Sequence, residues 1–110
     1  WAVDLAPHGI SVNAVLPAET WTPLYDRLLS ETPDPAAARR EIERLIPLGR
    51  RFTTIEEMAD MVVFLASGRS SHTTGQIIFV DGGSTHAPAD DRIIPVRAIG
   101  GAAIPAARTN

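Results

Sequence analysis

The 110-residue sequence has no cysteine, so it can form neither disulfides nor thiolate metal sites. Chains without cysteine suit a reducing compartment, and we therefore expect a cytoplasmic location. The ten basic residues are all arginines, spread along a chain of net charge −3, which argues against nucleic acid as a partner. The longest apolar run, Met61 to Ala66, is far shorter than the ~20 residues of a membrane span, so we expect no membrane partner.

Motifs for nucleotide binding and catalysis are missing too. The sequence has no Gly-x-Gly-x-x-Gly loop, because its paired glycines, Gly82-Gly83 and Gly100-Gly101, do not open a helix after a strand. The single tyrosine, Tyr25, is followed four positions later by Leu29, and no lysine occurs anywhere. The three histidines are scattered and lie in expected turns, which predicts no metal site.

What is present is the patterning of an ordinary globular chain, with 45% hydrophobic residues and a mean hydropathy near zero. Residues 1 to 7 have the pattern of the last turns of a helix that begins further upstream. Capping residues predict three further helices. These helices begin after Thr22, after Asp34 and after Thr54, which forms a capping box with Glu57, and they extend to about residues 30, 46 and 67.

Two apolar strands are expected at residues 10 to 16 and 76 to 81. About sixty residues, mostly helical, join them, which predicts a parallel pair with a right-handed crossover. Both strands are apolar on both faces, and a parallel pair alone would leave those faces bare. We therefore predict an α/β fold that is incomplete alone, the C-terminal portion of a Rossmann-type doubly wound parallel sheet with two strands plus helices. The last predicted helix should bury a core stripe of Ile55, Met58, Val62, Leu65 and Ala66.

The turn Pro17 to Thr22, which we call the rim, lies between the first strand and the next helix. In open α/β sheets ligands bind outside the carboxyl ends of the strands, and a helix N-terminus there offers free amides to an anion. The proline-hinged helices at about 22–46 fit a mobile lid over this rim, and equally fit two ordinary surface helices. After Gly83 the pattern is lost, which predicts an irregular tail at 84–110.

Charged residues near the last predicted helix have two interpretations. Arg50 and Arg51 could hold a phosphate or a carboxylate, but pairing with Glu56 and Glu57 is favoured. The same glutamates are expected to cap the helix rather than to act as an acid and base pair. Asp81-Gly82-Gly83 is predicted to be a turn whose glycines adopt positive φ.

Several segments, in one order and spacing, carry a family resemblance: Asp4 to Pro17, Ile46 to Arg50, Glu56 to Ala59, Phe64 to Ser67, Thr74 to Gln76, and Val80 to Gly83. Together they resemble the C-terminal part of a short-chain dehydrogenase/reductase, a Rossmann-type oxidoreductase that uses NAD or NADP. The resemblance covers residues 1–83 and leaves 84–110 outside. It implies hydride transfer between the nicotinamide and an alcohol or carbonyl substrate.

The family's glycine-rich cofactor loop, catalytic serine and Tyr-x-x-x-Lys precede the matched region. The resemblance therefore implies a missing N-terminal half of the same protein as a partner, and no catalytic residue in this chain, which alone would be inactive. The family turn Pro-Gly-x-Val-x-Thr corresponds to the rim, with Ala18 in place of the glycine and Thr20 in place of the valine. If the turn needs a positive φ at this point, Ala18 would strain it.

By resemblance, the cofactor-binding residues are Pro17, Ala18, Thr20 and Thr22. The Thr20 backbone would bond the nicotinamide carboxamide, and the Thr22 hydroxyl would reach the carboxamide or the pyrophosphate.

The rim sequence together with Thr22-Pro23-Leu24-Tyr25 resembles the branch that acts on aldoses such as L-fucose. This resemblance implies that Glu19, Trp21 and Tyr25 face a sugar substrate. Residues 54–81 resemble the surface through which family members form homotetramers, which would make Phe79 or Met61 an interface residue. A hypothesis of another class is that the chain is a truncated, non-enzymatic module for assembly or interaction.

Overall fold

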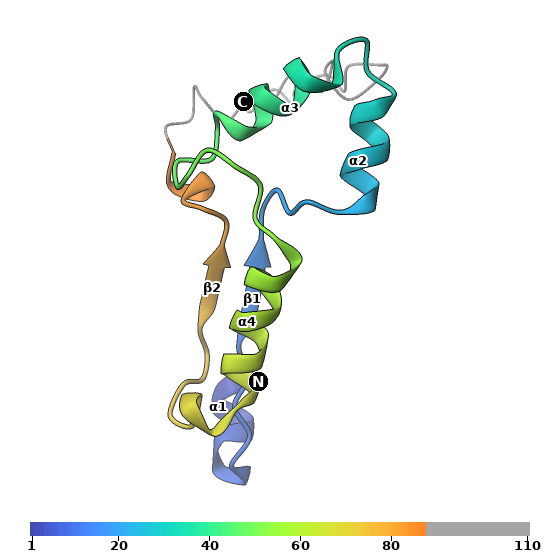
Figure 1. Ribbon diagram of the computed structural model, residues 1–110. Helices are drawn as coiled ribbons and strands as arrows, with labels where there is room; N and C mark the ends of the chain where they lie inside the picture. The colour runs from blue at the N-terminus through green and yellow to red at the C-terminus, as the bar shows by residue number, and fades with distance from the viewer. Residues whose placement is uncertain (88–110) are drawn as a thin grey trace, which may run out of the picture.

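The computed structural model describes residues 1–87. A two-stranded sheet, a long helix and a short N-terminal helix form a narrow body, and two further helices lie beyond the carboxyl ends of the strands (Figure 1). The elements, in chain order, are α1 (Ala2–Leu5), a 3-10 turn (Ala6–His8), β1 (Ala14–Pro17), α2 (Pro23–Ser30), α3 (Pro35–Glu43), α4 (Ile55–Ala66), a 3-10 turn (Gly68–Ser70), β2 (Ile77–Val80) and a 3-10 turn (Ser84–His86).

The two strands pair in parallel, with Ala14 opposite Ile77 and Pro17 opposite Val80, as the crossover pattern predicts. The predicted α/β class is confirmed, with two parallel strands and four α-helices within residues 1–87. The first strand is shorter than predicted. Before Ala14 the chain bonds to a turn rather than to the ladder, because the Val12 amide donates to the Thr74 hydroxyl at 3.0 Å.

Local capping explains where the helices begin. The Thr22 hydroxyl accepts from the Tyr25 amide at the start of α2, and the Asp34 carboxylate accepts from the Ala37 amide at the start of α3. At α4 both halves of the capping box between Thr54 and Glu57 are formed, as predicted. The helix α3 ends three residues earlier than expected, at Glu43.

The buried core lies between α2, α3 and the segment that precedes α4; we keep the name lid helices for α2 and α3 after their predicted role. Leu29 from α2 and Ile42 from α3 pack on Phe52, and Trp21 and Tyr25 from the rim side contact the same cluster. Because all three central side chains are almost fully buried, the lid helices are held by a hydrophobic core rather than lying loosely on the surface.

The predicted core stripe of α4 is wrong for the described chain. No residue of this helix is buried, and Ile55 and Val62 are 54% and 50% exposed. Ala66 is exposed as well, whereas Met58 and Leu65 are half-buried. Two strands offer too little apolar surface to cover this helix, which agrees with the expectation that the sheet is incomplete alone.

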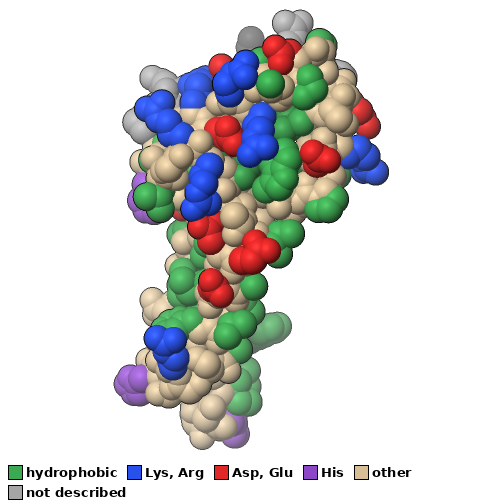
Figure 2. Space-filling view, in the orientation of Figure 1, with side chains coloured by type: hydrophobic (Ala, Val, Ile, Leu, Met, Phe, Trp, Pro, Cys, Tyr) green, Lys and Arg blue, Asp and Glu red, His purple; other side chains and the backbone are tan. Residues whose placement is uncertain are grey.

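The described part of the predicted tail is short. Ser84–His86 form a single 3-10 turn and Ala87 is buried. The prediction for 88–110 lies outside the described residues. Within residues 1–87, no helix combines the length and apolar character needed to cross a bilayer. Charged side chains of both signs are interspersed over the part of the surface above the strands (Figure 2).

Candidate functional site

The rim is fixed to the rest of the chain by a pair of backbone hydrogen bonds. The Thr53 amide donates to the Glu19 carbonyl at 3.0 Å, and the Trp21 amide donates to the Thr53 carbonyl at 2.8 Å. These bonds form an isolated parallel bridge in which Thr53 lies opposite Thr20. The rim is therefore an extension of β1 that pairs with the chain just before α4.

The bridge does not use the peptide groups of Thr20 itself. In parallel pairing, one residue bonds to the two neighbours of its opposite residue, so the Thr20 N–H and C=O point away from Thr53. Within residues 1–87 the structure gives these two groups no hydrogen bond. The Thr20 hydroxyl turns back and donates to the Ala18 carbonyl at 3.2 Å. Thr20 thus offers one backbone donor and one backbone acceptor on the open side of the rim.

Ala18 fits the turn without strain. Among the described residues, Arg50 is the one non-glycine with a positive φ, at 48°. The rim residues therefore all have negative φ, which any residue can adopt. The glycine usual in the family turn is not required here.

The Thr22 hydroxyl uses its acceptor oxygen within the chain and keeps its proton for donation. Its hydroxyl oxygen accepts from the Tyr25 amide at 3.4 Å, which caps α2. A hydroxyl also carries a proton that it can donate, so capping and ligand binding are compatible at this residue. The α2 N-terminus adds its partial positive charge at the same place.

Glu19 carries a buried polar atom without a partner in the described chain. One carboxylate oxygen, Oε2, is buried and has no hydrogen-bond partner in the described chain. Burial, and then the charge of Glu19, raise the pKa of the Tyr25 phenol above its usual value, so Tyr25 stays a neutral donor. A buried carboxylate oxygen without a donor is costly, which marks this point as a place for a ligand hydroxyl or a further polar group.

Trp21 is wedged between two elements. Its ring lies edge-on to Phe52, with ring centroids 5.1 Å apart, and the Arg39 guanidinium of α3 lies 4.3 Å from its centroid. Arg39 is in turn bonded to Glu43, one helical turn further on, at 2.7 Å. Tyr25 also packs edge-on to Phe52, with centroids 5.0 Å apart. Sequence reasoning missed Arg39 and Thr53 as rim contacts, because neither contact follows from local spacing.

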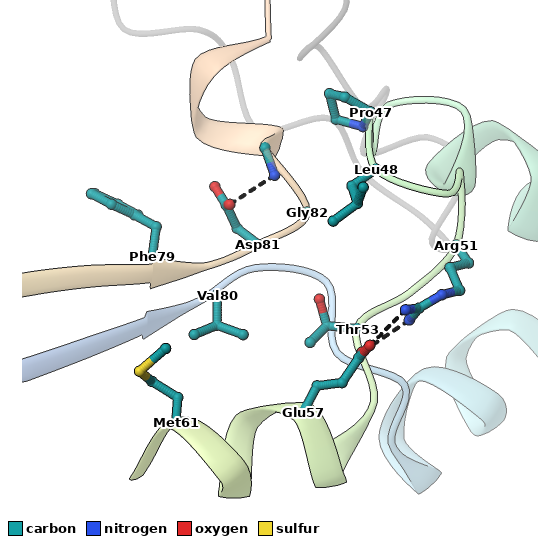
Figure 3. A pocket seen from close by; sticks show the side chains of 11 residues that line it. Pro47, Leu48, Arg51, Thr53, Glu57, Met61, Phe79, Val80, Asp81 and Gly82 are labelled. Carbon is teal, nitrogen blue, oxygen red and sulfur yellow. Dashed lines mark hydrogen bonds and ion pairs between the residues drawn. The ribbon is translucent and has the colours of Figure 1, made fainter. Parts of the chain in front are cut away.

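A cavity of about 650 Å³ lies on the other side of the Thr53 segment (Figure 3). It contains none of the residues predicted to bind cofactor or substrate, although Arg51 and the Asp81-Gly82-Gly83 turn line it. It is formed by the chain before α4, the first turns of α4 and the end of β2, through Pro47, Leu48, Arg51, Thr53, Glu57, Met61, Phe79, Val80, Asp81, Gly82 and Gly83.

The charged groups of the cavity already have partners. Arg51 bonds Glu57 through both terminal nitrogens, at 2.9 and 2.5 Å, which confirms the predicted pairing. The buried Asp81 accepts from the Gly83 and Thr85 amides at 2.9 and 2.8 Å. Burial alone would raise the pKa of Asp81, but hydrogen bonds from the Thr85 side chain and from the Thr85 and Gly83 amides, together with the charge of His86, lower it. The rim, with its unpaired Glu19 oxygen, is thus the better candidate for a polar ligand.

Asp81 also starts the predicted turn. Gly82 and Gly83 adopt φ of 60° and 86°, as expected for glycines in this turn. The Leu48 amide donates to the Gly82 carbonyl at 2.9 Å, so the turn holds the chain that leaves α3. Among residues 1–87, no three histidine or acidic side chains lie close enough together to hold a metal ion.

Comparison with known proteins identifies the family. A family model described as enoyl-(acyl carrier protein) reductase matches residues 1–85. The chain belongs to the short-chain dehydrogenase/reductase family. This assignment agrees with the parallel strands, the Asp-Gly-Gly turn and the position of the rim at the carboxyl end of β1.

Two curated short-chain dehydrogenase/reductase relatives show how much of the family fold these residues represent. The chain is 48% identical to L-xylulose reductase of Bos taurus, over 74% of this chain and 32% of the relative. It is 46% identical to the 3-oxoacyl-[acyl-carrier-protein] reductase FabG of Thermotoga maritima, over 76% of this chain and 31% of the relative. The chain thus spans about a third of the length of the curated relatives it matches.

A solved structure agrees in fold as well as in sequence. The crystal structure of Cj0485 dehydrogenase superposes with a TM-score of 0.77 and 49% identity, over 80% of this chain and 34% of that chain. Sequence and fold thus both place the chain in part of the family fold.

Proposed function

We propose that these residues form the nicotinamide-side wall of an NAD- or NADP-dependent oxidoreductase, which works together with the N-terminal part of the family fold. The observation that carries the proposal is that the Thr20 N–H and C=O, on the side of the rim turned away from Thr53, have no hydrogen bond within residues 1–87. A carboxamide has one acceptor oxygen and one donor NH₂ group, so it needs this combination of donor and acceptor.

In this proposal Pro17 and Ala18 shape the turn, the Thr20 backbone bonds the carboxamide, and Thr22 donates its hydroxyl proton to the carboxamide or pyrophosphate. The bound cofactor would supply or accept the hydride. The serine and Tyr-x-x-x-Lys of the family, which would move the substrate proton, are assigned to the N-terminal part. The chain itself then contributes binding and orientation, and it has no activity alone.

For the substrate we propose a sugar, bound against Glu19, Trp21 and Tyr25. The buried Glu19 oxygen needs a donor, and sugar hydroxyls supply donors in abundance. A neutral Tyr25 phenol adds a donor beside it. The name of the L-xylulose reductase relative is in keeping with a carbohydrate substrate, whereas the acyl substrate in the name of the FabG relative offers no row of hydroxyls for this carboxylate.

The experiment measures turnover of a panel of aldoses and ketoses with NAD, NADP and their reduced forms, using the complete protein that contains these residues. We expect turnover of at least one sugar, and a raised KM for that sugar in Glu19→Gln with little change in the cofactor dissociation constant. Binding of cofactor without turnover of any sugar would reject the sugar. No cofactor binding would reject the oxidoreductase and leave the assembly module as the better hypothesis.

We further propose that the whole protein is a cytoplasmic homotetramer in which α4 and β2 lie at an interface between subunits. The exposure of Phe79, at 42%, supports it, and half-buried Met61 is the second proposed interface residue. Light scattering of the complete protein tests the oligomeric state, and a monomer would contradict it.

A further inference from the structure

We propose that the ion pair between Arg51 and Glu57 is a positioning device for the rim. The proposal rests on the function proposed for Thr20, and it adds two residues that do not themselves touch the cofactor. They act by holding the short segment of residues 51–54, whose Thr53 backbone pairs with the rim on both sides of Thr20.

The Glu57 carboxylate holds both ends of this segment at once. Its Oε2 accepts from the Arg51 guanidinium and from the Thr54 amide, each at 2.9 Å, while Oε1 accepts from the second Arg51 nitrogen. Residues 52 and 53 are therefore enclosed in a loop closed by one side chain. Figure 3 shows the two side chains meeting directly beside Thr53.

Arg51 fastens the same loop from within. Its Nη1 also donates to the Phe52 carbonyl at 2.9 Å, so the guanidinium bonds both the helix and the segment. The backbone next to it is under strain, because Arg50 has a φ of 48°, in the left-handed region that side chains disfavour. A strained turn beside the rim persists only when neighbouring contacts hold it, and the Arg51 contacts are placed to do so.

The effect on the site follows from the pairing. Thr53 can keep the Thr20 peptide groups facing outward only while it stays fixed opposite the rim. If residues 51–54 loosen, the amides of Trp21 and Thr53 lose protection and the Thr20 donor and acceptor lose their fixed direction. Cofactor affinity should then fall through lost pre-organisation, although every group that touches the cofactor is still present.

The sequence offers matched controls at adjacent positions. Glu57→Gln removes the charge but keeps an oxygen that can still cap Thr54, so the helix start is retained. Glu56→Gln makes the same change one residue away, on an exposed side chain. Arg51→Gln is matched by Arg50→Gln in the same way. Arg51→Lys keeps the charge but loses the bidentate hydrogen bonding to Glu57.

The test uses the complete protein and two readouts. The first is hydrogen exchange at the Trp21 and Thr53 amides, which needs no cofactor. The second is the dissociation constant of NAD or NADP, whichever the wild type binds more tightly. We expect Glu57→Gln and Arg51→Gln to speed exchange at both amides several-fold and to weaken cofactor binding several-fold. Arg51→Lys should fall between, and the controls at 50 and 56 should match the wild type.

Unchanged hydrogen exchange at the Trp21 and Thr53 amides in Glu57→Gln and Arg51→Gln would overturn the proposal, whether or not the cofactor dissociation constant changes. Faster exchange with unchanged cofactor affinity would also overturn it, because the rim would then bind cofactor without being positioned. If the wild type binds no cofactor, the proposed function fails, and the exchange data alone then decide whether the ion pair holds the rim.

Discussion

Gly82 and Ile46 approach each other so closely that no side chain fits between them. A Cβ added at Gly82 would lie 2.5 Å from Cγ2 of Ile46, and Gly82 has a φ of 60°. The end of β2 and the chain leaving α3 are therefore in contact through a glycine, and Ile46 is almost fully buried there.

Substituting Gly82 should destabilise the protein. Gly82→Ala combines a clash in a packed site with a left-handed backbone, and we expect a loss of about 1–3 kcal/mol in the free energy of unfolding. Gly68→Ala is the control, since a Cβ there meets nothing within 4 Å and Gly68 has no positive φ. Urea unfolding of both variants measures the difference. Equal stability would show that Ile46 moves aside freely.

The contribution of the Arg51 and Glu57 pair should depend on pH in a defined direction. Hydrogen bonds from Arg51, and then from the Thr54 amide, lower the pKa of Glu57 to about 2. A carboxylate with a lowered pKa stabilises the fold above its unfolded pKa, and this stabilisation is lost as the pH falls through the folded value. The stability difference between wild type and Glu57→Gln should be constant near neutral pH and shrink below about pH 4.5.

Unfolding midpoints at several pH values measure this difference. Glu56→Gln serves as the control, because it removes a neighbouring carboxylate of the same helix turn. A stability difference for Glu57→Gln that stays the same down to about pH 3 would mean that the ion pair adds nothing to stability.

Truncating a core side chain between α2 and α3 should lower the free energy of unfolding strongly. Ile42 is 1% exposed and packs on Phe52 and Leu29, so Ile42→Ala should cost about 2–5 kcal/mol through lost burial and a remaining cavity. Leu24→Ala in α2 is the comparison, since Leu24 is 54% exposed and should cost far less. Thermal unfolding of the two variants decides the matter, and similar losses would contradict the packing described.

Tyr25 should titrate above the usual tyrosine range. Burial is the larger cause of its raised pKa and the charge of Glu19 the smaller, so Glu19→Gln should lower the pKa of Tyr25 only in part. NMR of the labelled tyrosine ring carbon, followed from about pH 8 upward, measures both values. A Glu19→Gln variant whose Tyr25 titrates like free tyrosine would reverse the ranking of the two causes.

Much of the local structure could be predicted from the sequence. The starts of α2, α3 and α4 follow from Thr22, Asp34 and the Thr54 capping box, because caps act within one turn. The parallel pairing of the strands follows from the length of the crossover. The family assignment followed from motifs in a fixed order.

The long-range contacts could not be predicted in the same way. The bridge between Thr20 and Thr53 joins residues far apart in the chain, and the sequence around neither residue has a periodic pattern that predicts the pairing. The stripe of α4 was expected to be buried because its spacing is helical, but spacing indicates which face is apolar and not what covers it. The predicted roles of Glu19, Thr20 and Thr22 remain predictions.

The packing around Phe52 changes what a lid can mean in this protein. The Phe52 ring contacts Trp21 and Tyr25, and Leu29 and Ile42 pack against the same ring. The rim and the lid helices therefore share one hydrophobic cluster, and we expect them to open together. Opening this lid would not uncover a preformed rim, since α2 and α3 can swing away only by exposing Phe52 or by taking the rim with them.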